Sequence, residues 1–323
     1  MAVSCEKADV YTMNPRTNFE ALWTIIDEHY CYFDYKGVDW DEVHSRYSTL
    51  LSDTMDKYEL FDLLANMLSE LKDGHTNLIS SFDIGRYWAW YEDYPANFSY
   101  DIQKNYLGTN YLIGRGLKYI QLAGTKVGYV YYGSFSSAVG EDNLDEMFVH
   151  FKNCKGIIID VRDNGGGSLT YSDRMASRFA EEKITAGYIL HKVGPGHNDF
   201  SEPYPIELEP SSRVRWLRPV VVLTNRHSYS ATNDFVNKMR QLPYVTILGD
   251  RTGGGGGLPF NSELPNGWSV RFSASPMLDA NKQHTEDGIE PDIKVDMAKS
   301  DASKGKDTMI ETAIRLLERS DQE

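Results

Sequence analysis

Apolar residues recur at helical spacing along the first quarter of the chain, separated by polar positions. The pattern predicts one helix that begins at a capping box of Thr17 and Glu20, a second over 41–51 and a third from Lys57. The third is expected to end at Lys72-Asp73-Gly74, because a glycine after a helix commonly takes the left-handed conformation that closes it. The first part of the chain is therefore predicted to be helical.

From residue 126 the pattern changes to strands that alternate with helices. Continuous apolar runs, "GIIIDVR" (156–162) and "PVVVLTN" (219–225), are typical of strands that are buried on both faces. Amphipathic segments between and after them, the last over 308–317, predict helices that cover these strands. The alternation predicts an α/β core with a largely parallel sheet.

These changes of pattern divide the chain into four parts. We expect a flexible N-terminal tail over 1–16, a helical domain over 17–80 and the α/β core over 126–323. The intervening residues 81–125 are rich in tyrosine, tryptophan and glycine, and they predict short strands and loops.

The composition excludes several classes of protein. A formal net charge of −14 without a long Lys/Arg cluster argues against nucleic acid or an anionic membrane as a partner, and no apolar run is long enough to span a bilayer. The three cysteines, Cys5, Cys31 and Cys154, are scattered, which indicates neither a disulfide framework nor a zinc site. Two interpretations of Cys5 stay open: the lipid-bearing residue of an exported lipoprotein, or a free cysteine in a disordered tail.

Two glycine-rich segments follow predicted strands, where α/β proteins collect their chemistry. The segment "DNGGGS" (163–168) exposes backbone amides that suit a phosphate or the oxyanion of a tetrahedral intermediate, but it lacks the residues of a P-loop or a dinucleotide fingerprint. The segment "TGGGGG" (252–257) predicts either a mobile loop or a close approach of two backbones. A flexible turn would carry the same glycines, so neither segment alone assigns a function.

Ser230 and His75 stand at the ends of predicted helices. Ser230 precedes a helix, so it is either a helix cap or a nucleophile whose oxyanion would meet the helix-end amides. A GxSxG elbow is missing, which argues against an α/β-hydrolase. His75 follows a helix end and is either a solvated turn residue or a general base.

Four segments in this order resemble the S41 peptidases, which include the C-terminal processing (tail-specific) proteases and the tricorn protease core. They are "LKDGHTNL" (71–78), "GIIIDVRDNGGG" (156–167), "VVVLTNRHSYSATNDF" (220–235) and "EDGIEPDI" (286–293). The resemblance implies a crotonase/ClpP-like spiral of ββα units, preceded by a small N-terminal helical domain. Many tail-specific members carry a PDZ domain before the core, but the segment available here is short, so we expect no complete one.

The resemblance also implies a catalytic site without a metal or organic cofactor. Ser230, which opens "SATN", takes the place of the nucleophile. The tail-specific branch has a catalytic lysine in the turn that is here "GDRTGGGGGLPF" (249–260), which contains no lysine. The tricorn-like branch uses a histidine and a glutamate instead, and His75 and Glu286 take these places, while Gly74 replaces a serine of that branch.

The resemblance leaves several assignments open. Asp287 and Glu290 compete with Glu286 for the role of the carboxylate that orients the base. The oxyanion hole is expected from the amide of Gly165 or Gly166, together with the amide of Ala231. His227 is either an alternative base or a residue at the rim of the site.

The expected function is that of a serine endopeptidase acting on a protein or peptide, exported to the periplasm or cell envelope. One alternative is a catalytically weak or inactive S41-like protein that binds a ligand or peptide. Two features favour it: Gly74, and the Thr232-Asn233 pair in place of the family's Ser-Glu. Retention of both Ser230 and His75 favours the peptidase. A crotonase-type acyl-CoA enzyme is a further alternative, but the acidic composition does not suggest a CoA-binding surface.

Overall fold

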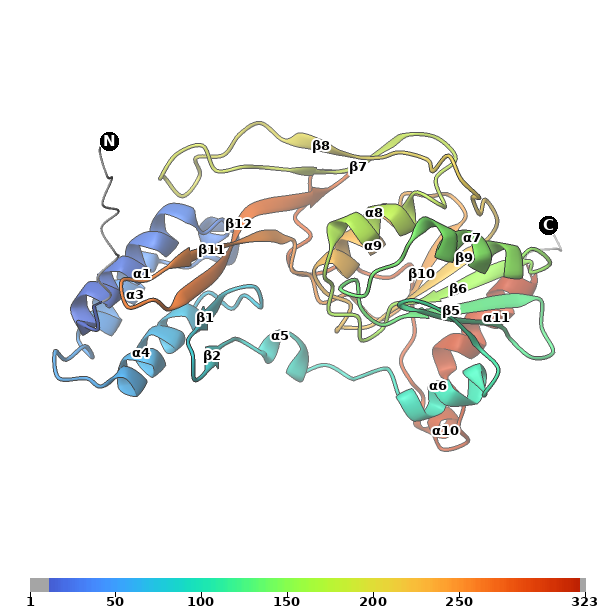
Figure 1. The fold of residues 1–323 in the computed structure, drawn as a ribbon, viewed down its shortest axis with the longest axis horizontal. Coiled ribbons are helices and arrows are strands. Elements are labelled where there is room, and N and C mark those ends of the chain that lie inside the picture. The colour runs from blue at the N-terminus through green and yellow to red at the C-terminus, as the bar shows by residue number, and fades with distance from the viewer. Residues whose placement is uncertain (1–11, 320–323) are drawn as a thin grey trace, which may run out of the picture. The chain divides into compact units, whose positions relative to one another are not determined.

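The computed structural model describes residues 12–319, and Figure 1 shows the helices and strands. Cys5, the candidate for a lipid, lies outside the described residues. No helix of the described chain is long and apolar enough to cross a bilayer. The chain forms two compact units: the first holds the residues up to 90 with 190–202 and 257–276, and the second holds 91–189, 203–256 and 277 onward.

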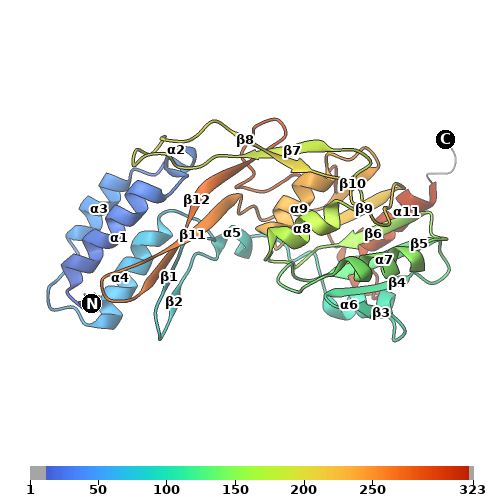
Figure 2. The same cartoon turned by 45° about the horizontal axis from the view of Figure 1, so that its top comes forward.

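The first unit begins with four helices, which Figure 2 shows in blue: α1 (Pro15–His29), α2 (Phe33–Lys36), α3 (Trp40–Ser48) and α4 (Lys57–Ser69). The predicted capping box at Thr17 is wrong, because Asn14 caps α1 by accepting the Thr17 N–H at 2.9 Å. Helix α4 begins as predicted but ends at Ser69. Lys72, with a φ of 48°, takes the left-handed conformation that we expected of Gly74.

A small antiparallel sheet completes the first unit. It contains β1 (Asn77–Ile79), β2 (Ile84–Gly85), β11 (Gly257–Glu263) and the first part of β12 (Ser269–Asp279). Strand β12 pairs with β1 along one edge, where Asn77 lies opposite Arg271, and with β11 along the other edge. Apolar residues of α1 and α4 pack with Val270 and Phe272 of β12 in one core. This core fixes the turn between α4 and β1, which carries His75.

The second unit is built on one seven-stranded sheet. In spatial order its strands are β13 (Ile293–Lys294), β10 (Val245–Gly249), β9 (Val220–Thr224), β6 (Gly156–Asp160), β5 (Val127–Tyr132), β4 (Leu117–Gln121) and β3 (Leu112–Gly114). The strands from β13 to β5 are parallel, and β4 and β3 are antiparallel. The predicted α/β core with a largely parallel sheet, preceded by N-terminal helices, is confirmed.

Both faces of this sheet are covered by helices, which explains the continuous apolar runs. Ile157, Ile159 and Val222 pack with residues of α7 (Glu141–His150), α8 (Leu169–Ala176) and α9 (Ala231–Met239). Ile158 and Val221 point to the other face and pack with α11 (Thr308–Arg319). Alternate residues of one strand therefore enter different cores.

The remaining elements are α5 (Ala89–Glu92), α6 (Tyr100–Leu107), β7 (Ile184–Ile189), β8 (Tyr204–Leu208) and α10 (Lys299–Ala302). Strands β7 and β8 form a hairpin, and β7 pairs with the end of β12 from Met277. The expectation of only strands and loops over 81–125 is wrong, because α6 is a regular helix capped by Ser99.

Candidate active site

The side chain of Asn164 holds the glycine loop that follows β6. Its Oδ1 accepts the N–H groups of Phe135 (3.2 Å) and Gly166 (3.0 Å), and its Nδ2 donates to the Tyr132 carbonyl (2.7 Å). The Asn164 carbonyl accepts the N–H of Tyr229 (3.1 Å), directly before the predicted nucleophile. The loop is thereby tied to the serine segment. Our sequence reasoning missed Asn164, although an asparagine before three glycines at a strand end is a visible signal.

Ser230 has a strained backbone at the start of α9. Its φ of 60° and ψ of −121° are rare for a residue with a side chain and cost about 1–3 kcal/mol. The Ser230 N–H donates to the Gly254 carbonyl (2.8 Å), and the Ser230 carbonyl accepts the Asp234 N–H (3.0 Å). The side chain makes no capping hydrogen bond, so the helix-cap interpretation is wrong. A strained strand-to-helix turn is the setting in which nucleophilic serines of other folds occur.

Gly166 lies directly against the serine. A Cβ on Gly166 would lie 2.7 Å from Ser230 Cβ and 2.9 Å from the Ala231 nitrogen, so only glycine fits. The Gly166 N–H already donates to Asn164. The N–H groups of Gly165 and Ala231, in contrast, donate to no acceptor within the described residues. These two are therefore the amides still available to an oxyanion.

The glycine run packs closely against the Glu286 segment. All residues from 252 to 257 are buried. Gly254 has a φ of +81°, and a Cβ on it would overlap the Glu286 carbonyl oxygen, well inside the 3.0 Å that real Cβ contacts keep. The Gly255 N–H donates to the same oxygen (3.0 Å). Of our two interpretations of this run, the close approach of two backbones describes the structure.

The three candidate carboxylates differ in burial. Glu286 is 6% exposed. Asp287 and Glu290 are both exposed, and Glu290 forms an ion pair with Arg251 (3.3 Å). A carboxylate shielded from water acts more strongly on a neighbouring charge than a solvated one. The burial therefore favours Glu286 for the catalytic role.

Asn233 connects helix α9 with the Glu286 segment. Its Nδ2 donates to the Thr285 carbonyl (3.0 Å), and its Oδ1 accepts the hydroxyl of Thr252 (2.6 Å). The same hydroxyl oxygen accepts the N–H of Ile289 (2.7 Å). Three segments that are distant in the sequence thus meet in one buried network beside Ser230.

His75 lies in the first unit, whereas Ser230, Glu286 and the candidate oxyanion amides lie in the second. The imidazole is 4% exposed. Burial lowers the pKa of His75 to about 4; the Asp73 carboxylate acts against this shift, and Arg271 and Lys36 reinforce it. At pH 7 the imidazole is neutral and can accept a proton.

His227 is half-buried in the second unit. Its ring lies 4.3 Å from that of Tyr91, and its backbone N–H donates to Asn225 Oδ1 (3.2 Å). These contacts describe a packed loop residue. They give no specific support to a role as a base.

A cavity of about 10 Å³ lies beside Ser230, which has room for about one water molecule. Asn237 lines it, and Asn237 Oδ1 has no hydrogen-bond partner within the described residues. The other lining residues are Asn233, Asp234, Gly255, Gly256, Met277 and Thr285. The cavity on this side of Ser230 is too small for a substrate side chain.

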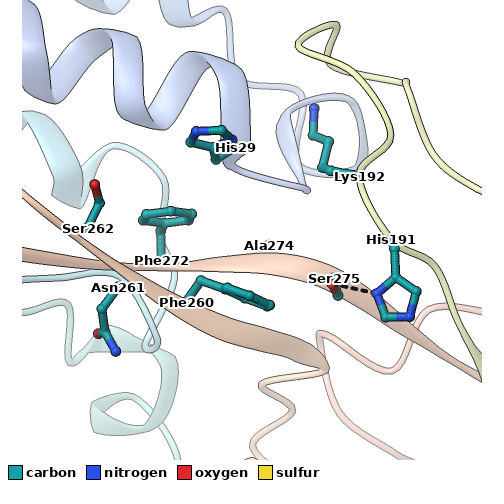
Figure 3. A pocket seen from close by; sticks show the side chains of 9 residues that line it. All are labelled: His29, His191, Lys192, Phe260, Asn261, Ser262, Phe272, Ala274 and Ser275. Atoms are coloured by element: carbon teal, nitrogen blue, oxygen red, sulfur yellow. Dashed lines mark hydrogen bonds between the residues drawn. The ribbon is translucent and has the colours of Figure 1, made fainter.

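The first unit has a separate cavity of about 330 Å³, drawn in Figure 3. The His29 ring stacks on Phe272, and His191 Nδ1 lies 3.3 Å from Ser275 Oγ. Phe260 lies opposite Phe272 in the β11–β12 ladder. None of the predicted catalytic residues lines this cavity. Within residues 12–319, no group of three or more acidic, His or Cys side chains is arranged to hold a metal ion.

Comparison with known proteins gives two family matches. Residues 126–295 match the model of peptidase family S41, and residues 12–69 match that of the tricorn protease C1 domain. A solved structure of a "putative peptidase" from Parabacteroides merdae is 69% identical, with a TM-score of 0.92, covering 95% of this chain and 97% of that one. Mature CPAF in complex with lactacystin is 12% identical, with a TM-score of 0.72 over 96% of this chain and 99% of that one, a likeness of fold.

Curated relatives are more distant. The carboxy-terminal processing protease CtpA of Bacillus subtilis is 23% identical over 55% of this chain and 37% of its own length. The tricorn protease of Thermoplasma acidophilum is 27% identical over 59% of this chain and 16% of its own length. This chain thus spans well under half the length of both relatives.

Proposed function

This chain belongs to peptidase family S41, and we propose that it is a serine endopeptidase that cleaves protein or peptide substrates through an acyl-enzyme on Ser230. In this proposal His75 removes the proton from Ser230 Oγ as the oxygen attacks the peptide carbonyl carbon. The amides of Ala231 and Gly165 stabilise the resulting oxyanion. His75 then gives its proton to the departing amine. Water, activated by the same histidine, hydrolyses the ester and regenerates the serine.

The observation that carries this proposal is the backbone of Ser230. A conformation that costs about 1–3 kcal/mol is expected to persist only where the surroundings impose it, and such strain gathers at functional sites. The Ala231 N–H, at the start of a helix where the dipole favours negative charge, has no acceptor within the described residues. A serine that serves only to cap a helix would not need this strained backbone.

The proposal requires His75 and Ser230 to meet during catalysis, and a fluorophosphonate probe tests this. Intact-mass measurement should show a single adduct on the native protein. The adduct should be absent from Ser230→Ala and His75→Ala, but present on His227→Ala, the matched histidine control. No adduct on the native protein would refute an activated serine and favour an S41-like protein that only binds peptides. Loss in His227→Ala but not in His75→Ala would assign the base to His227.

Glu286 is proposed to orient the base, because it is the buried member of the three candidate carboxylates. Glu286→Gln should slow labelling by the same probe, whereas Asp287→Asn and Glu290→Gln should not. Equal losses in all three variants would refute this assignment.

We also propose that the protein is exported to the cell envelope, with Cys5 as the candidate for lipid attachment. Cell fractionation of the full-length gene product, with and without Cys5→Ser, tests this. Recovery of the native protein in the cytosolic fraction would refute export.

A further inference from the structure

We propose that Asp73 is a positioning residue for catalysis, whose carboxylate stabilises the protonated form of His75. This proposal rests on the proposed function, because it concerns the charge that the base acquires when it accepts a proton from Ser230. Glu286 has the analogous role in our expectation from the family. Asp73 would be an additional carboxylate, supplied by the same turn that carries the histidine.

The side chain of Asp73 is hydrogen-bonded to the backbone of His75. Asp73 Oδ1 accepts the N–H of His75 (2.8 Å), and the Asp73 carbonyl accepts the N–H of Thr76 (3.1 Å). The residue is 1% exposed. Its second oxygen, Oδ2, is also buried. An aspartate or asparagine in such a turn needs only one oxygen to hold the backbone.

The burial of this carboxylate requires an explanation, because a buried carboxylate is costly unless another charge compensates it. Lys36 lies near, since its ammonium donates to the Lys72 carbonyl (3.0 Å). Burial raises the pKa of Asp73, but the charges of Lys36 and protonated His75, together with hydrogen bonds from the His75 backbone and Ser273, outweigh burial and lower it. At pH 7 the carboxylate is therefore ionised and the imidazole beside it is neutral.

The charges that act on His75 have opposite signs. Burial lowers the pKa of His75 most; Arg271, on the adjacent strand β12, and Lys36 lower it further. The Gly257 backbone and the Asp73 carboxylate raise it, and Asp73 is the one anionic side chain in this set. When the imidazole becomes positive in a buried site with two cations near it, this carboxylate offsets their repulsion.

Two substitutions with opposite expected effects test the proposal. Asp73→Asn keeps an oxygen for the His75 N–H but removes the charge, so fluorophosphonate labelling at pH 7 should slow by about tenfold or more. Arg271→Met removes a repelling charge, so the acidic limb of the labelling rate against pH should move up by about one unit. NMR titration of His75 in a Ser230→Ala background should give the same directions: a lower pKa with Asp73→Asn and a higher one with Arg271→Met.

The outcomes separate this proposal from the proposed function. If the native protein is not labelled, the proposed function fails, while the NMR titration still decides whether Asp73 acts on His75. If the native protein is labelled, and Asp73→Asn leaves both the labelling profile and the pKa of His75 unchanged, Asp73 is only a turn residue and this proposal is overturned. Should Asp73→Asn not fold, Asp73→Ser retains a side-chain acceptor for the turn and answers the same question.

Discussion

Substituting Gly254 by alanine should disable the serine without touching any proposed catalytic side chain. Gly254 has a φ of +81°, and its carbonyl accepts the Ser230 N–H. The Glu286 carbonyl oxygen occupies the space that a Cβ on residue 254 would need. An alanine here must therefore push the Glu286 segment away or break the hydrogen bond that holds Ser230. Either movement alters the geometry of the site.

The magnitude can be worked out against a control glycine. Gly124 has a φ of +74°, and nothing lies within 4 Å of its would-be Cβ, so Gly124→Ala isolates the cost of the backbone conformation, about 1–2 kcal/mol. Gly254→Ala has the same conformational cost plus that of overpacking, typically a further 1–3 kcal/mol. The overlap requires a shift of about 1 Å, and a misplacement of that size can slow catalysis on the order of 100-fold.

Labelling rates with fluorophosphonate and urea unfolding of both variants provide the assay. We expect Gly124→Ala to be labelled at the native rate with a small loss of stability, and Gly254→Ala to be labelled about 100-fold more slowly with a larger loss. Native-rate labelling of Gly254→Ala would refute the reasoning, because the close approach of the two backbones would then be dispensable.

Three further predictions follow from buried charge and strain. Arg162→Met should cost about 3–5 kcal/mol in urea unfolding, because the fully buried guanidinium pairs with two fully buried aspartates. Arg213→Met, at an exposed ion-pair site, should cost much less, and equal costs would contradict this. Ser230→Gly should be about 1 kcal/mol more stable than Ser230→Ala, since glycine relieves the positive φ, and a less stable glycine variant would argue against strain. Stability should fall as pH drops from 6.5 towards 4, on the order of 3 kcal/mol, because there the unfolded chain binds a proton at His75 and the folded one does not. His75→Gln should flatten this slope in urea unfolding at pH 7 and 4.5, and an unchanged slope would refute it.

The α/β core could be predicted from the sequence because its central strands β6 and β9 are continuous apolar runs with polar residues only at their ends. The residues of β6 and β9 enter cores on both faces, so no polar position interrupts their pattern. The β11–β12 hairpin was not predicted, since β11 has only one buried residue and begins at the last glycine of the glycine run. Strand β1, which pairs with β12, is also distant from it in the sequence. Local pattern therefore identifies strands that are buried throughout, but not edge strands that depend on remote partners.

The residues of the candidate site could be selected from motifs, but their backbone conformations and hydrogen bonds could not be predicted. The sequence placed Ser230 before a helix without showing that its φ is positive or that its side chain leaves the helix uncapped. It left Gly165 and Gly166 equivalent, whereas in the structure the N–H of Gly166 donates to Asn164. It gave Asp73 no role beyond the end of a helix. These properties arise from contacts between segments far apart in the chain.

The same contacts explain why the backbone conformation of residue 230 should not depend on the serine side chain. The conformation of Ser230 is held by its own N–H on the Gly254 carbonyl and by the Tyr229 N–H on the Asn164 carbonyl. Both are backbone hydrogen bonds supplied by the two glycine loops. Replacing Ser230 by alanine removes the reactive oxygen but neither hydrogen bond. The backbone conformation is thus imposed by the loops, and replacing the serine by alanine is not expected to change it.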